Sequence, residues 1–250
     1  MTTTNKKFRA DQLVFEQGLA ESREQAKRWI MAGQVSVGTP PLRVEKPGHS
    51  YPASTVFSVA GQERFVSRGA YKLLTALEYF TLDVTGLVCL DAGASTGGFT
   101  DCLLQHGAAK VYAVDVGHGQ LHEKMRQNPR VINLERNNLR IAQPSLIPEF
   151  VDMVVADVSF ISLTLVLPPC MQWLRPGGKV VALIKPQFEV GPHQTVKGIV
   201  HDEAVRQSAV DKVVEFCKAQ LLLDCVGVVP SALKGPKGNQ EYLTLLQRRL

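Results

Sequence analysis

The sequence has 250 residues, of which 45% are hydrophobic and 20% are charged. This length suffices for one large domain, or for a small domain followed by a medium one, and the composition is that of an ordinary globular protein. The longest apolar runs, such as residues 180–184, have only the length of a strand, whereas a membrane-spanning helix needs roughly 18 apolar residues. The first 14 residues contain basic side chains but no apolar stretch behind them, which argues against a secretory signal.

The cysteines bear on the compartment. There are five, an odd number, and no two of them form a CxxC pair, which argues against a disulfide framework and against a zinc site. We therefore expect reduced, buried thiols, a cytoplasmic protein and no bound metal; the cysteines are Cys89, Cys102, Cys170, Cys217 and Cys225.

The net charge of +5 is concentrated in the first third of the chain. Residues 1–72 contain 11 Lys and Arg against 6 Asp and Glu, whereas residues 73–250 contain 17 of each kind. This distribution indicates an anion-binding module joined to a neutral body. The charge alone is equally compatible with a solvated basic face that binds nothing.

The N-terminal third begins with a helical pattern. Residues 8–19 read as a short amphipathic helix closed by Gly18. Ser22 is the expected N-cap of a second helix, because Gln25 follows it at the spacing of a capping box, and Gly33 is the expected end of that helix. Two alternating runs, 34–37 and 55–59, then predict the strands of a small sheet.

This arrangement resembles the S-four-type RNA-binding module, named for a ribosomal protein, over about residues 8–60. The stretch GLAESREQAKRWIMAGQVSVG follows the family's order of helix, glycine turn and strand. The resemblance implies that the basic second helix contacts RNA phosphates, which would give affinity and register without choice of sequence. The residues expected in that role are Arg23, Lys27 and Arg28.

Residues 61–70 are expected to be a linker, and residues 71–250 a second domain in which strands alternate with helices. Such alternation predicts an α/β fold with a mostly parallel sheet covered by helices on both faces. The expected strands are 85–93, 110–117, 151–158, 177–188, 221–230 and 240–247, with a further one before LERNN; the expected helices include 96–107, 163–174 and 201–220.

The stretch LVCLDAGASTGGFT, residues 87–100, delivers an acidic residue at the end of a strand and then turns through small residues into a helix. Glycines there allow a ligand to approach the backbone closely at the helix N-terminus. The stretch matches neither GxGxxG nor a GK[ST] phosphate loop. It resembles the first motif of class I methyltransferases, which implies bound S-adenosylmethionine held by Asp91, Gly93, Ala94, Ser95, Gly97, Gly98 and Phe99.

Two further positions complete the expected cofactor site. Asp115 ends the next strand, where a carboxylate can accept hydrogen bonds from both hydroxyls of a ribose. The segment LERNN resembles the part of the family that lies near the adenine, so that Asn137 or Asn138 would bind the base edge. The sequence does not decide between these two asparagines.

Four polar residues stand where packing alone would not place them. Lys72 opens a helix, Asp157 and Lys185 each end an apolar strand, and Glu241 begins the last strand. The carboxyl ends of parallel strands line the crevice of such a sheet, so Asp157 and Lys185 should share a cleft with the cofactor. In isolation, each of the four would equally suit a structural ion pair, and each of the two lysines would also suit a side chain that snorkels to the surface.

This Lys–Asp–Lys–Glu order resembles the tetrad of FtsJ-type ribose 2′-O-methyltransferases. The wider resemblance is to the TlyA family, bacterial ribosomal-RNA 2′-O-methyltransferases also labelled haemolysin A. It extends over nearly the whole chain through FVSRGAYKL, LDAGASTGGFTDCLL, VDVGHGQL, VVADVSFISL, IKPQFEVG and GPKGNQEY.

The resemblance implies an rRNA (cytidine-2′-O-)-methyltransferase acting on ribosomal RNA or ribosomal subunits, with no membrane and no obligate protein partner. Lys185 would contact the 2′-oxygen, either to stabilise the developing alkoxide or as a base in a dry site beside a second lysine. Asp157 would orient Lys185 and lie near the methyl group, while Lys72 and Glu241 would bind the ribose. By the same resemblance, the target would lie in the large subunit alone or in both subunits. The ending QRRL resembles the shorter form of the family, which is specific for the large subunit.

Three other readings are weighed against this one. A membrane-active haemolysin would need a spanning segment or a strongly amphipathic interfacial helix, and the sequence offers neither. An RNA-binding protein with an inactive methyltransferase domain is disfavoured by the four polar residues and the glycines. An enzyme of another RNA-modifying class, such as a pseudouridine synthase, can carry the same N-terminal module, but the cofactor motif disfavours it.

Overall fold

A computed structural model describes residues 7–20, 22–38, 40–61 and 64–250. The expectation about a secretory signal depends largely on residues 1–6, and part of the expected linker is formed by residues 62–63; both stretches lie outside the described residues. The chain divides into two compact units, Met1–Arg64 and Phe65–Leu250. Phe65 is buried in the core of the second unit, so that this unit begins within the stretch 61–70.

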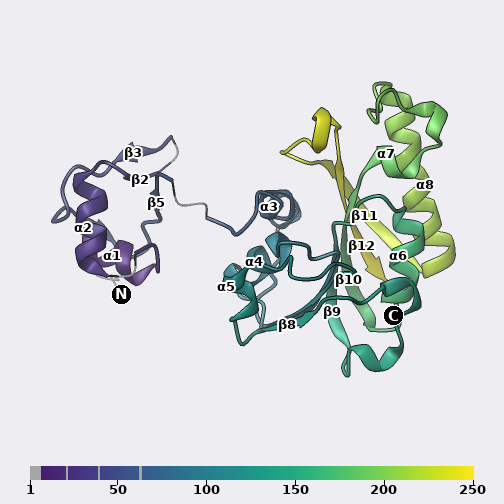
Figure 1. Cartoon of the computed structure of the whole chain (residues 1–250), viewed down its shortest axis with the longest axis horizontal. Helices are drawn as coiled ribbons and strands as arrows, with labels where there is room; N and C mark the ends of the chain where they lie inside the picture. The colour runs from purple at the N-terminus through teal and green to yellow at the C-terminus, as the bar shows by residue number, and fades with distance from the viewer. Residues whose placement is uncertain (1–6, 21, 39, 62–63) are drawn as a thin grey trace, which may run out of the picture. The chain divides into compact units, whose positions relative to one another are not determined.

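The first unit is a small α+β domain with two helices and two small sheets in its described part (Figure 1). Strands β2 and β3 pair antiparallel, as do β2 and β5, and β1 pairs with β4 in a separate two-stranded sheet. A core that includes Val14, Ala26, Ile30 and Phe57 lies between the helices and the sheets. The elements are β1 Lys7–Arg9, α1 Ala10–Glu16, α2 Arg23–Met31, β2 Val35–Val37, β3 Leu42–Arg43, β4 Ser50–Pro52 and β5 Phe57–Val59.

The structure contradicts the predicted start of the first helix of this unit and confirms the predicted start of the second. The predicted start of the first helix at residue 8 is wrong, because Phe8 pairs with Tyr51 across β1 and β4 and the helix begins at Ala10. Ser22 caps α2 as predicted, accepting a hydrogen bond from the Gln25 backbone N–H at 3.2 Å.

The second unit has a seven-stranded sheet in the order β11-β12-β10-β9-β6-β7-β8. Strands β10, β9, β6, β7 and β8 run parallel to one another, as predicted, while β12 lies antiparallel between β10 and β11. The strands are β6 Val88–Ala92, β7 Lys110–Val114, β8 Val131–Leu134, β9 Val151–Ala156, β10 Leu174–Ile184, β11 Leu223–Pro230 and β12 Tyr242–Arg248.

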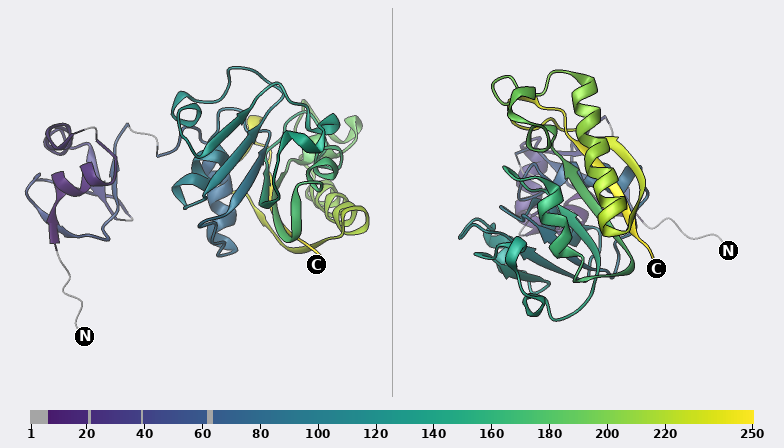
Figure 2. Two further views of the ribbon diagram at one scale, coloured as in Figure 1. Left: turned by 90° about the horizontal axis from the view of Figure 1, so that it is seen from below. Right: turned by 90° about the vertical axis from the view of Figure 1, so that its right-hand side faces the viewer.

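Helices cover both faces of this sheet (Figures 1 and 2). Helices α3 and α4 enclose one hydrophobic core, with Leu73 and Leu103 fully buried, and α6 and α8 enclose the other, with Leu167 and Val213. The helices are α3 Ala70–Tyr79, α4 Gly98–Gln105, α5 Glu123–Arg126, α6 Leu163–Cys170, α7 Pro186–Glu189 and α8 Glu203–Leu221. Short 3-10 helices lie at Leu139–Ile141, Pro144–Leu146, Pro192–Gln194 and Pro236–Gly238.

The apolar patterns explain why this sheet forms. Strands β6, β9 and β10 carry near-continuous apolar runs because both of their faces are covered by helices. Four of the five cysteines are buried in these layers, and all five are free thiols. No helix in the described part of the chain is both long and apolar enough to span a membrane.

Candidate functional site

The parallel strands end at one edge of the sheet, and two adjoining hollows lie there. The smaller, of about 150 Å³, is lined by the β6–α4 turn, by Ser67 and Gly69, and by Asp157 and Lys185. The larger, of about 500 Å³, extends from Asp157 towards Asp115 and the segment 137–140. Gly93, Ser95, Asp157 and Ser159 line both hollows, so the two form one continuous candidate site.

Asp91 lies at the floor of the smaller hollow with its side chain fully buried. Its Oδ2 accepts a hydrogen bond of 2.7 Å from the Thr100 hydroxyl, whereas its Oδ1 has no hydrogen-bond partner among the described residues. Burial, reinforced by the charges of Asp157 and Asp115, raises the pKa of Asp91 to about 7. A buried carboxylate oxygen without a donor suits a ligand that brings a positive charge or an N–H group.

The turn between β6 and α4 depends on glycine. Gly93 has a φ of +84°, and a Cβ there would lie 3.0 Å from the Asp157 carbonyl oxygen. Gly97 has a φ of +91° as the N-cap residue of α4 and lies against Leu121 and Met125. Ala94, Ser95, Gly98 and Phe99, which the sequence analysis assigned to the cofactor, line the smaller hollow.

The larger hollow contains Asp115, Asn137 and Asn138. Asp115 follows β7, and its two carboxylate oxygens accept the backbone N–H groups of Ser95 and Gly117 at 2.8 and 2.7 Å. Both asparagines support the backbone: Asn137 donates to the Leu134 and Glu135 carbonyls, and Asn138 accepts from the Arg140 N–H.

A neighbouring glutamate, Glu135, holds the backbone at Gln120, a residue that lines the larger hollow. Its carboxylate accepts the N–H groups of Gln120 and Leu121, and these backbone hydrogen bonds lower the pKa of Glu135 to about 2.

Lys185 and Asp157 form an ion pair between neighbouring strands. The Lys185 Nζ lies 2.6 Å from Asp157 Oδ1 and donates a hydrogen bond of 2.7 Å to the Ser159 hydroxyl. Lys185 is only 6% exposed, so both partners are needed to offset the cost of burying its charge.

Lys72 and Glu241 form a second ion pair, one strand further along the sheet. The Lys72 Nζ lies 2.6 Å from Glu241 Oε2, and Glu241 is fully buried. Glu241 Oε1 has no hydrogen-bond partner among the described residues. Gly235 packs against this carboxylate so closely that a Cβ at position 235 would overlap Glu241 Oε1.

The register of the sheet brings the two ion pairs together. Ile184 of β10 faces Tyr242 of β12, so Lys185 and Glu241 stand next to each other just beyond this pair. In the parallel part of the sheet, Ala182 faces Ala156, which directly precedes Asp157. The four polar residues predicted from the sequence therefore lie at one edge of three adjacent strands and on the helix α3 that packs beside them.

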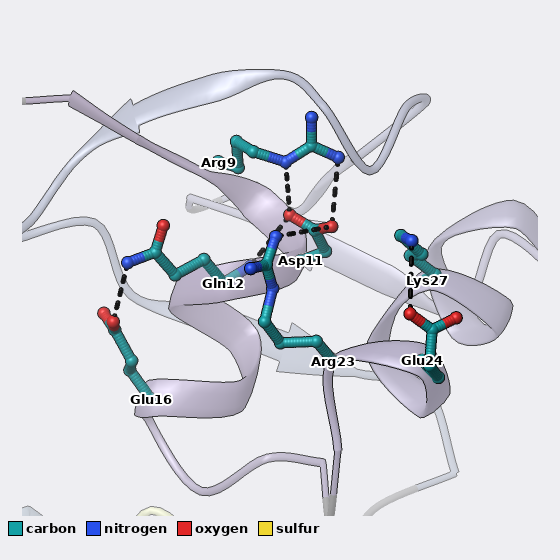
Figure 3. Close-up of polar contacts among 7 residues, drawn as sticks. All are labelled: Arg9, Asp11, Gln12, Glu16, Arg23, Glu24 and Lys27. Carbon is teal, nitrogen blue, oxygen red and sulfur yellow. Dashed lines mark hydrogen bonds and ion pairs between the residues drawn. The ribbon is translucent and has the colours of Figure 1, made fainter.

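The three basic residues predicted on α2 differ in their surroundings. Arg23 contacts the buried carboxylate of Asp11 at 3.4 Å, Lys27 pairs with the exposed Glu24 at 3.2 Å (Figure 3), and Arg28 is exposed.

Sequence reasoning missed two serines of the site. Ser159 accepts from Lys185, and Ser67 lines the smaller hollow while its hydroxyl accepts the Gly69 N–H at 3.1 Å. Neither lies on a periodic element, so the only available signal was their place within the quoted stretches VVADVSFISL and FVSRGAYKL.

Comparisons with known proteins identify the family of each unit. The family model described as FtsJ-like methyltransferase matches residues 65–248, and the S4 domain model matches residues 8–39. The chain is 46% identical over 246 residues to "16S/23S rRNA (cytidine-2'-O)-methyltransferase TlyA" of Mycobacterium tuberculosis, covering 97% of this chain and 90% of the relative.

Two solved structures show the same fold. The structure titled "Putative hemolysin from Streptococcus thermophilus" is 43% identical with a TM-score of 0.73, and the match covers 98% of this chain and 90% of that one. N-methyltransferase NodS from Bradyrhizobium japonicum, in complex with S-adenosyl-l-homocysteine, is 15% identical with a TM-score of 0.50 and covers 72% of this chain and 86% of its own. The second likeness concerns the fold alone.

Proposed function

Because the chain belongs to the FtsJ-like methyltransferase family, we propose that it methylates the ribose 2′-hydroxyl of a cytidine in ribosomal RNA, with S-adenosylmethionine as the methyl donor. The observation that carries this proposal is the Lys185–Asp157 ion pair at the wall of the hollow that the glycine turn forms. This pair lines the hollow proposed to hold the methyl donor, where a charged group can act on the ribose 2′-hydroxyl.

The residues of the two hollows suit this cofactor. The cofactor supplies an electrophilic methyl group on a sulfonium. The unpaired Oδ1 of Asp91 can accept a hydrogen bond from the ammonium group of the cofactor. The turn Gly93–Ser95 leaves room beside the backbone for the amino-acid part of the cofactor. Asp115 is proposed to bind the ribose hydroxyls, with the adenine beside Asn137 and Asn138. Phe99 and Gly98 complete the smaller hollow, and Gly97 shapes the turn behind it.

Lys185 is the group proposed to contact the 2′-oxygen. An ammonium has three donors, and Asp157 and Ser159 take two of them, which leaves one for the ribose. Two roles balance the reaction: Lys185 stabilises the developing alkoxide while the 2′-hydroxyl proton leaves to solvent, or a neutral Lys185 amine takes that proton itself. Asp157 orients Lys185 and lies near the methyl group, because it lines both hollows.

Lys72 and Glu241 are proposed to bind the target ribose. Neither residue lines the two hollows, and Gly235 covers the unpaired Oε1 of Glu241, so this oxygen would accept from a sugar hydroxyl only after the segment that carries Gly235 moves away. Its partner Lys72 is held by Oε2 at 2.6 Å. Arg23, Lys27 and Arg28 of the first unit are proposed to contact RNA phosphates. We place the reaction in the cytoplasm, without a protein partner, and leave both ribosomal subunits as candidate substrates.

The test is transfer of tritium from labelled S-adenosylmethionine to isolated large and small ribosomal subunits, followed by alkaline cleavage of the RNA. A 2′-O-methyl group protects the adjacent phosphodiester, so we expect the label at an alkali-resistant site. Lys185→Ala should lower kcat by about 10²–10⁴-fold while the cofactor Kd stays within about threefold. Lys179→Ala, on the same strand but away from the hollows, is the matched control.

The outcomes separate the competing functions. Label at an alkali-sensitive site would indicate base methylation and refute the ribose assignment. Near-normal activity of Lys185→Ala would refute the role of Lys185. Good cofactor binding without transfer to either subunit would favour an RNA-binding protein with an inactive domain. Leakage of dye from liposomes would favour the haemolysin reading.

A further inference from the structure

We propose that Glu189 is a positioning residue for methyl transfer: its buried carboxylate fastens the segment that carries Asp157 to the segment that carries Lys185. The first segment, residues 157–162, directly follows β9, and the second, residues 185–189, directly follows β10. We call them the two strand-end segments. The inference rests on the proposed function, because it takes the Lys185–Asp157 ion pair as part of the reacting site.

The carboxylate of Glu189 joins the two strand-end segments at the end away from the sheet. Glu189 is the last residue of α7 and is only 4% exposed. Its Oε2 accepts the Ser162 hydroxyl at 2.5 Å, and its Oε1 accepts the Leu163 backbone N–H at 2.8 Å. Both oxygens therefore bond to the chain that follows β9, although Glu189 itself belongs to the chain that follows β10.

Lys185 joins the two segments at the end next to the sheet. Its Nζ lies 2.6 Å from Asp157 Oδ1 and 2.7 Å from the Ser159 hydroxyl. Between the two ends, the rings of Phe160 and Phe188 contact each other with their centroids 5.1 Å apart. The segments are thus joined at three places along their length, and the ion pair is one of them.

A strained bend lies in the first segment, between its two joined ends. Phe160 has a φ of +64°, in the left-handed region that is unfavourable for a residue with a Cβ. Phe160 is 91% exposed, so packing does little to hold this backbone conformation. Hydrogen bonds to the second segment fix Ser159 on one side of the bend and Ser162 on the other. Release of Ser162 should let the bend relax and loosen the ion pair at the opposite end.

Glu189 is itself anchored to the body of the second unit. Its backbone carbonyl oxygen accepts a hydrogen bond of 2.6 Å from the Lys212 ammonium of α8. Helix α8 packs against both α6 and α7, and its residue Val213 is buried in the core (Figure 1). The second segment is therefore fixed, and the first segment is the one that would move when the contact is lost.

A role as a helix cap does not account for this carboxylate. Helix α6 has an N-cap of its own, because the Ser162 hydroxyl accepts the Thr164 backbone N–H at 3.2 Å. Burial raises the pKa of Glu189, and the hydrogen bonds from Ser162 and Leu163 oppose that rise. Burying an acid costs free energy, so its presence beside a helix that is already capped favours a role in holding the two segments together.

The first test is Glu189→Ala, assayed by tritium transfer from labelled S-adenosylmethionine to ribosomal subunits. A small misplacement of reacting groups can cost about 10²-fold in rate, so we expect kcat to fall by about 10- to 100-fold while the cofactor Kd stays unchanged. In a Lys185→Ala background, the same substitution should lower kcat by less than about twofold more, because the group that it positions is already absent.

The matched control is Glu149→Ala. It also removes a carboxylate with two side-chain partners, since Glu149 accepts from Lys110 at 2.7 Å and from Tyr112 at 2.5 Å. Glu149 is not among the residues that line the two hollows, so its loss should leave kcat unchanged.

A milder pair of variants keeps the test decisive if Glu189→Ala fails to fold by circular dichroism. Ser162→Ala removes the hydroxyl that bonds Glu189, whereas Ser162→Thr keeps it. Loss of one hydrogen bond should lower kcat by about fivefold in Ser162→Ala, and Ser162→Thr should stay within about twofold of the parent.

The reactivity of Lys185 is a readout that needs no enzymatic activity. Formaldehyde with a borohydride reductant methylates accessible lysine amines, and Lys185 is only 6% exposed. Mass spectrometry should find its modification about fivefold faster in Glu189→Ala, because the loosened segment opens more often. Lys124, whose side chain is 61% exposed, should react equally fast in both proteins.

Unchanged kcat in folded Glu189→Ala would overturn the inference, as would an equal loss in Glu149→Ala, a full additional loss in the Lys185→Ala background, or equal modification of Lys185 in variant and parent. If the unaltered chain transfers no label to either subunit, the proposed function fails, while the modification of Lys185 still decides whether Glu189 positions it. Failure of the inference and failure of the proposed function are therefore distinguishable.

Discussion

The buried carboxylate of Asp91 should make the stability of the second unit depend on pH in a specific direction. Its pKa is raised from 3.8 in the unfolded chain to about 7 in the folded unit. Between these values the folded state keeps a proton that the unfolded state has released, so the free energy of unfolding falls as pH rises. Above about pH 7 both states are ionised, and this contribution becomes constant.

The magnitude follows from the pKa difference. Each pH unit within this window changes the free energy of unfolding by about 1.4 kcal/mol. Between pH 5 and pH 7, Asp91 should therefore cost the protein about 2 kcal/mol of stability, because the slope flattens as the pH approaches each pKa. Asp91→Asn cannot ionise, so this slope should disappear, and the variant should gain stability relative to the parent as pH rises.

The assay is urea unfolding of both proteins at pH 5, 6, 7 and 8. The chain has two tryptophans, Trp29 in the first unit and the buried Trp173 in the second. In a Trp29→Phe background, Trp173 emission reports the second unit alone. Other titrating groups cancel in the difference between parent and variant. Parallel curves of stability against pH would show that Asp91 is ionised throughout and would refute the argument.

Two other predictions concern the site. The cofactor carries positive charges, and Asp91 must be ionised to bind them, so the affinity for S-adenosylmethionine should rise about tenfold per pH unit below pH 7 and level off above it. Calorimetry of Asp91→Asn should find weaker binding that does not depend on pH in this way. A pH profile of the variant equal to that of the parent would contradict the assignment. Gly235→Ala should displace the Glu241 carboxylate from Lys72 and lower kcat about 10²-fold, with cofactor affinity unchanged. The control is Gly191→Ala, because a Cβ at position 191 would make only an ordinary contact of 3.7 Å. Equal activity of the two variants would refute the steric argument.

The fold of the second unit could be predicted from the sequence because its signals are local. Each of its main signals can be recognised within a stretch of about ten residues. These signals are the apolar runs of β6, β9 and β10 and the glycine turn before α4. The start of the first helix could not be predicted in this way. Lys7–Arg9 becomes a strand only because Ser50–Pro52, far along the chain, pairs with it.

The site was predictable in its residue types and less so in its contacts. A charged residue at the end of an apolar strand is visible in the sequence, and the pairing of Asp157 with Lys185 was expected. Ser159 was not foreseen, because a loop serine carries no periodic signal. The burial of Asp11 was missed for the opposite reason: this residue looks like an ordinary acidic residue in the first turn of a helix, and only the folded unit buries it. The roles of these residues in catalysis and RNA binding stay predictions until the variants are measured.

The antiparallel placement of β12 between β10 and β11 has a consequence for how this protein can change during evolution. Lys185 and Glu241 lie 56 positions apart in sequence, yet the backbone register of two paired strands alone keeps them side by side. A deletion or insertion of one residue within β12 would turn its side chains to the other face and separate the two charges. Length variation should therefore be excluded from Tyr242–Arg248.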